Sequence, residues 1–189
     1  MKFEVTRITP STVFVTTLTA EEFKKFDIFR CLTHSYAKYK PTGNDFMDAF
    51  IELVSRHLMC SCEIYGQQMG ISARVLAKML LPYSGMTFVQ WRNAYVLLAA
   101  CELLRDTDYT LAEIGVRLGF SGNNTFGRWF TKETDQTPAL WRSRAKNRKE
   151  REERELLQEL KALLHSGQLY KENGAWKLNA TATDTDEKE

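Results

Sequence analysis

Apolar side chains recur at helical spacing over most of the chain, with polar residues between them. One helix is predicted from Phe46 to about Leu58, because its apolar residues share one side. A longer helix is predicted over residues 88–105, because Thr87 is a good N-cap and apolar residues cover more than one side of the turns after it. At ~1.5 Å per residue that helix is ~27 Å long, so it is predicted to join two packed halves of one domain.

The most informative pattern lies in residues 110–142. Thr110 is predicted to cap a helix whose apolar stripe ends at Leu118. Gly119 then ends the helix, because glycine adopts a left-handed backbone at little cost. A short, buried turn is expected at this point.

A second helix is predicted directly after this turn, with Ser121 as its cap and with Phe126 and Phe130 on its buried side. The outward face is predicted to carry Asn123, Asn124 and Arg128. Asparagine reads adenine and arginine reads guanine through paired hydrogen bonds, so this face is suited to a DNA major groove. The competing interpretation is an ordinary solvated helix face.

A weaker copy of the pattern occurs earlier in the chain. Ser61 is predicted to cap a helix over residues 62–69, Gly70 to supply the turn, and Ser72 to cap the next helix. The apolar positions of that next helix are predicted to be Val75, Leu76 and Met79. Its outward basic positions are Arg74 and Lys78.

Ten residues at fixed spacing resemble the AraC/XylS family of bacterial transcription regulators: Leu111, Ile114, Gly119, Phe120, Phe126, Phe130, Thr137, Pro138, Trp141 and Arg142. Gly115, Thr131 and Asp135 depart from the family pattern without removing the turn. The resemblance implies a mainly α fold, with a DNA-binding domain over residues 45–142. Its two helix-turn-helix subdomains would lie at about 62–81 and 111–131, joined by a linker helix at about 88–105.

The resemblance also implies which residues touch DNA. Base contacts are expected from Asn123, Asn124, Arg128 and Arg74. Contacts to the phosphate backbone are expected from Lys78, Thr125, Lys132 and Arg142. The first subdomain has Leu81 and Pro82 where the family usually has further basic residues, so its DNA contacts are expected to be weaker.

The two ends of the chain are predicted to add small elements to this domain. Residues 1–44 are expected to form a short β/α segment, too small for a ligand-binding domain. Loosely alternating apolar residues predict two strands within residues 1–18, and a brief helix is predicted over residues 19–26. Residues 143–179 are expected to form a helical extension and a hairpin centred on Asn173-Gly174. The acidic tail, 180–189, is expected to be disordered, so short β additions at both termini complete the predicted fold.

The helical extension has a basic first half, 142–151, and then an apolar stripe formed by Leu156, Leu157, Leu160, Leu163 and Leu164. The basic half is either a solvated helix face or a clamp for phosphates. The stripe is expected to fold back onto the chain's own small β elements. Pairing with a second copy is the alternative, so a monomer and a weak homodimer through the C-terminal helix both stay open.

Charge and composition exclude several classes of protein. The net charge of +2 is nearly balanced, and there is neither an apolar leader segment nor a membrane-spanning run. Cys60 and Cys62 lack the further ligands that a metal site needs, and the four cysteines have no disulfide spacing. His34, His57 and His165 are scattered and no catalytic motif appears, so neither an enzyme nor a cofactor is expected.

We therefore expect a sequence-specific DNA-binding transcription regulator without a large ligand-binding domain, located in the cytoplasm and associated with the nucleoid. Its expected partner is double-stranded DNA, RNA polymerase is a further candidate, and a membrane is not expected. The alternative is a protein-interaction adaptor built on a degenerate copy of the same fold. The sequence does not identify the operator, the direction of regulation or a controlling ligand.

Overall fold

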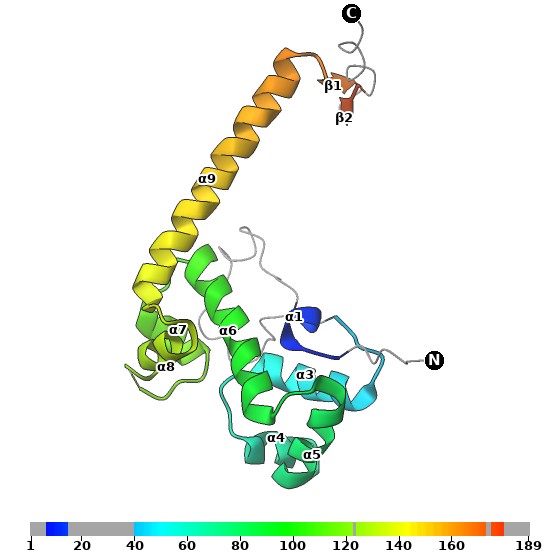
Figure 1. The fold of residues 1–189 in the computed structure, drawn as a ribbon, viewed down its shortest axis with the longest axis vertical. Helices are drawn as coiled ribbons and strands as arrows, with labels where there is room; N and C mark the ends of the chain where they lie inside the picture. The colour runs from blue at the N-terminus through cyan, green and yellow to red at the C-terminus, as the bar shows by residue number, and fades with distance from the viewer. Residues whose placement is uncertain (1–6, 15–39, 123, 173–174, 180–189) are drawn as a thin grey trace, which may run out of the picture. The chain divides into compact units, whose positions relative to one another are not determined.

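The computed structural model describes residues 7–14, 40–122, 124–172 and 175–179, which form two compact units, residues 1–143 and 144–189. The fold is mainly α, as predicted (Figure 1). The helices are α1 (Pro10–Val13), α3 (Asp45–His57), α4 (Cys62–Gln68), α5 (Ala73–Ser84), α6 (Phe88–Asp106), α7 (Leu111–Arg117), α8 (Thr125–Thr134) and α9 (Pro138–His165). The strands are β1 (Leu169–Glu172) and β2 (Ala175–Leu178).

The predicted linker helix, α6, lies in the core of the first unit. Thr87 caps it as expected, and the side chain of Gln90 accepts a hydrogen bond from the Thr87 backbone in return. Trp91 and Tyr95 are fully buried and stack with their ring centroids 5.6 Å apart. Phe50 on α3 meets Trp91 edge to face at 5.0 Å. α6 is therefore packed on several sides, as its apolar pattern predicted.

The strands predicted near the N-terminus are wrong where the structure describes that part of the chain. Residues 10–13 form α1 instead, because Thr9 and Thr12 make a capping box and Pro10 starts the helix with a suitable backbone angle. This segment packs on α6: Trp91 Nε1 donates to the Ile8 carbonyl at 3.1 Å. The helix expected within residues 19–26 and the acidic tail lie outside the described residues.

The second unit contains most of α9 and the predicted hairpin. β1 and β2 pair antiparallel, with Leu169 opposite Leu178 and Glu172 opposite Ala175. The leucines at positions 156, 157, 160 and 164 are exposed on α9. The fold-back expected for this stripe stays a prediction, because residues 1–6 and 15–39 lie outside the described residues. Among all the described residues, no helix has the length and apolar character that crossing a membrane requires.

Candidate nucleic-acid interface

The turn between α4 and α5 depends on two glycines. Gly70 has a φ of +67°, and the Ile71 backbone N–H donates to the Gly66 carbonyl at 2.9 Å. A Cβ at Gly66 would lie 2.7 Å from the Ile71 carbonyl oxygen, which is closer than side chains approach backbone atoms. Glycine at position 66 therefore allows α5 to start close to α4.

The turn between α7 and α8 repeats this geometry. Gly119 has a φ of +85°, and the Phe120 backbone N–H donates to the Gly115 carbonyl at 2.9 Å. A Cβ at Gly115 would lie 3.2 Å from the Cβ of Phe126 on α8. Gly115, which departs from the family pattern, therefore lies where α7 and α8 pack closely together. The predicted helix-turn-helix is present.

The exposed face of α5 is broader and more apolar than predicted. Ser72 caps the helix as expected, and Arg74 and Lys78 are exposed. Val75 and Met79, which were predicted as apolar positions of this helix together with Leu76, are however 42% and 37% exposed, so they do not belong to its buried face. The residues that α5 buries lie four positions apart, a row that faces the core of an α-helix: Leu76, Leu80 and Ser84.

Helix α8 starts later than predicted. It begins at Thr125 with Asn124 at the N-cap, so the expected cap at Ser121 is wrong. The Thr125 hydroxyl donates to the Gly122 carbonyl at 2.6 Å, which closes a turn at the place predicted for the first helical turn. Asn124 therefore stands at the tip of the helix, and Asn123 lies outside the described residues.

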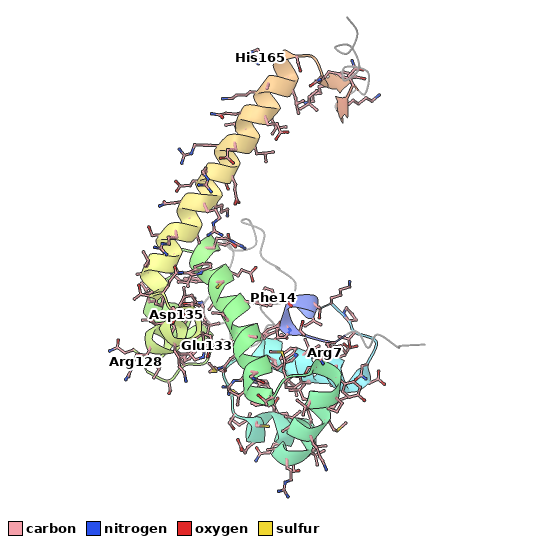
Figure 2. The ribbon with its side chains drawn as sticks, viewed as in Figure 1. Arg7, Phe14, Arg128, Glu133, Asp135 and His165 are labelled. Atoms are coloured by element: carbon pink, nitrogen blue, oxygen red, sulfur yellow. The ribbon has the colours of Figure 1, made fainter. Side chains whose placement is uncertain are left out.

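The predicted burial of Phe126 and Phe130 is confirmed. Arg128 and Lys132 are exposed on the other side of α8. Figure 2 shows Arg128 extending away from the helix.

The two helix-turn-helix units end alike, which gives a structural alignment between them. The Ser84 hydroxyl on α5 donates to the Leu80 carbonyl at 2.8 Å, and the Thr134 hydroxyl on α8 donates to the Phe130 carbonyl at 2.8 Å. These positions are fifty residues apart in both pairs. The same offset matches Arg74 with Asn124, Val75 with Thr125, Lys78 with Arg128 and Pro82 with Lys132.

Two adjacent residues of α6 connect to both units. Arg92 Nη1 donates to the Cys60 carbonyl at 2.7 Å, just before α4. Asn93 Nδ2 donates to Glu133 Oε1 on α8 at 3.0 Å. Neither residue stands out in the sequence, because polar contacts between distant segments leave no local pattern.

Arg142 lies beside the loop that precedes α7. It is half-buried and its Nη2 donates to the Tyr109 carbonyl at 2.5 Å. The Arg117 guanidinium stacks over the Tyr109 ring, 3.7 Å from its centroid. The structure thus gives Arg142 an internal partner, whereas its phosphate contact stays a prediction.

The described cysteines are partly buried and unpaired with one another. Cys60, Cys62 and Cys101 are free thiols, and burial raises the pKa of Cys101 to about 11. Within the described residues no three His, Cys, Asp or Glu side chains are grouped to hold a metal ion.

Comparisons with known proteins agree with this geometry. A family model described as "Helix-turn-helix domain" matches residues 65–144. The transcriptional activator RhaR of Salmonella typhimurium is 32% identical over 98 residues, which cover 51% of this chain and 35% of that protein. The RhaR of Salmonella arizonae matches to the same extent. The chain thus matches about a third of the length of these curated relatives.

Two solved structures are similar over about half of the chain. One is the DNA-binding domain of AdpA in complex with a target DNA, with a TM-score of 0.49, 22% identity, and 55% and 94% of the two chains covered. The other is an AraC-type transcriptional regulator from Chromobacterium violaceum, with a TM-score of 0.47, 21% identity, and 53% and 92% covered. The family match, the two helix-turn-helix units and the residues at fixed spacing agree: residues 65–144 form a helix-turn-helix domain similar to those of AraC/XylS regulators.

Proposed function

We propose that this protein is a sequence-specific transcription regulator that places α5 and α8 in successive major grooves of DNA. One observation carries the proposal: two helices with matching ends and exposed basic faces belong to helix-turn-helix units that each accept a hydrogen bond from one of two neighbouring residues of α6, at the Cys60 carbonyl before α4 and at Glu133 on α8. The second helix of such a unit enters the major groove in helix-turn-helix proteins. The RhaR relatives are named transcriptional activators, which supports the same role for this chain.

In this proposal the tip of α8 reads bases. Asn124 and Arg128 are exposed there, and Asn123 is assigned to the same set from the sequence. Amides pair with adenine and guanidinium groups with guanine. We assign the same base-reading role on α5 to Arg74, because it aligns with Asn124 on α8.

The remaining basic and hydroxyl groups would hold the phosphate backbone. Lys78, Thr125 and Lys132 are exposed on the two recognition helices. Arg142 and Thr125 are the weaker members of this set, because the Arg142 guanidinium already donates to the Tyr109 carbonyl and the Thr125 hydroxyl to the Gly122 carbonyl. Phosphate contacts add affinity and fix the register without reading the sequence.

RNA polymerase is the proposed protein partner for an activator of this kind, and binding to the chromosome would associate the protein with the nucleoid. A second function, a protein-interaction adaptor, is favoured by one specific observation. The leucines at positions 156, 157, 160 and 164 leave an apolar stripe exposed on α9. DNA binding and such docking are separable by experiment.

Selection of bound duplexes from a random pool tests the proposed function. We expect the recovered sequences to share two half-sites about one helical turn, ~34 Å, apart. Recovery of unrelated sequences, with no retention above that of a non-binding control protein, would favour the adaptor.

A further inference from the structure

Helix α5 exposes apolar side chains beside its cations. Val75 is 42% exposed, Met79 37% and Leu81 51%. Within the described residues, α8 exposes no large hydrophobic side chain of this kind. Exposed apolar residues on a helix that faces a ligand indicate an apolar group on that ligand.

The position of Val75 is the second observation. It is the third residue of α5, and the first residues of a recognition helix are the ones that reach base edges. The fifty-residue alignment matches Val75 with Thr125 at the start of α8. The Thr125 hydroxyl is held by the Gly122 carbonyl, so the methyl group is the part of Thr125 left for an outside contact. Both units thus carry a β-branched side chain at the same exposed position.

We propose that Val75 recognises the C5-methyl group of a thymine in the half-site bound by α5, with Met79 one turn behind it. This inference rests on the proposed function, since it requires α5 to enter a major groove. The thymine methyl is the apolar group that bases present there, and small apolar side chains recognise it by contact. Val75 and Met79 are four residues apart, so they lie on the same side of the helix.

The charges on α5 favour DNA over a protein as the occupant of this face. Arg74 and Lys78 border the apolar row, and α5 contains no acidic residue. Within the described chain neither cation forms an ion pair with a carboxylate. DNA carries negatively charged phosphates and thymine methyl groups, so it complements both the two cations and the apolar row of α5.

Replacing thymine by deoxyuridine, one position at a time, tests this contact on the selected duplex. Deoxyuridine keeps the base-pairing groups and removes the methyl. We expect the wild-type protein to lose about fourfold in affinity at one thymine of the α5 half-site, the value of about one buried methyl group. In the Val75→Ala protein the same replacement should leave the DNA affinity unchanged. The Val75→Thr protein, which carries the residue found at the equivalent position 125 of α8, should still lose affinity when the thymine is replaced.

Three results separate the possible failures. No sequence-specific binding by the wild-type protein means that the proposed function itself is wrong. Specific binding that is insensitive to every deoxyuridine in that half-site overturns the contact, and unchanged DNA affinity of Val75→Ala then assigns the apolar row to a protein partner. A deoxyuridine loss that persists in a Val75→Ala protein with a native melting temperature also overturns it, because another residue then contacts the methyl.

Discussion

The side-chain amide of Asn93 on α6 donates a hydrogen bond to the carboxylate of Glu133 on α8 across 3.0 Å. Its neighbour Arg92 donates to the Cys60 carbonyl at the start of the other unit. The Met59 backbone N–H also donates to the carbonyl of Leu118 at 3.1 Å. Contacts on both sides of α6 therefore fix the distance between the two recognition helices.

A fixed distance makes DNA binding sensitive to half-site spacing. Insertion of about five base pairs rotates one half-site to the opposite side of the duplex, where only one helix can reach its groove. We expect affinity to fall at least tenfold in a gel-shift titration of the spaced duplex. Equal affinity for the original and spaced duplexes would show that the two units move independently.

Lys78 is predicted to hold a phosphate. Lys78→Ala should weaken binding to specific and random duplexes alike, and it should lower the slope of log affinity against log salt by about one unit. A salt series with both duplexes measures this. Weakening confined to one half-site sequence, with the slope unchanged, would instead make Lys78 a base reader.

Two glycines on different helices give a matched test of the packing. Gly66→Ala places a Cβ 2.7 Å from a backbone oxygen, so we expect a loss of about 1 to 3 kcal/mol in unfolding free energy. A Cβ at Gly127 on α8 meets nothing within 4 Å, so Gly127→Ala should gain up to about 1 kcal/mol from helix propensity. Equal stability of the two variants in denaturant titrations would contradict the turn geometry described above.

Glu113 gives α7, the first helix of the second helix-turn-helix, an acid-sensitive N-terminal cap. Its carboxylate accepts hydrogen bonds from the Thr110 backbone N–H and hydroxyl at 2.7 and 2.8 Å, which lower its pKa below the ordinary 4.5. A lowered pKa in the folded state adds stability above pH 4.5 that is lost as the pH falls through the folded value. Glu113→Gln keeps the cap without the titration, so its melting temperature should fall less between pH 5 and pH 3 than that of the wild type. The same fall in both proteins would assign the acid sensitivity to other groups.

Local signals in the sequence predicted much of the fold. Thr87, Thr110 and Ser72 cap their helices as expected, because a cap depends on residues within one turn. The cap at Ser121 was wrong, because the Gly122–Thr125 turn delays the helix. The exposure of Val75 was missed for another reason: apolar type alone does not distinguish a core position from a contact surface.

The N-terminal segment shows the same limit. Alternating apolar residues predicted strands, while the Thr9 capping box and Pro10 produced a helical turn that packs on α6. The contacts of Arg92, Asn93 and Arg142 join segments far apart in the chain, so no spacing rule predicts them. The base-contacting residues came from the family resemblance and are predictions still.

The most direct test of base reading by α8 is a competition titration of Arg128→Ala, with the selected duplex and a random duplex at one salt concentration. Arg128 is exposed on α8, and a bidentate contact to guanine is worth about 1 to 3 kcal/mol of discrimination. Arg56→Ala on α3 removes an arginine that pairs with Glu52 and lies outside both recognition helices, so it serves as the control. We predict that Arg128→Ala reduces the difference in binding free energy between the selected and the random duplex by about 1 to 3 kcal/mol and relaxes the preference at one base pair. Arg56→Ala should change neither the free-energy difference nor the base preference. If Arg128→Ala leaves the difference in binding free energy between the two duplexes unchanged, base reading by α8 is contradicted.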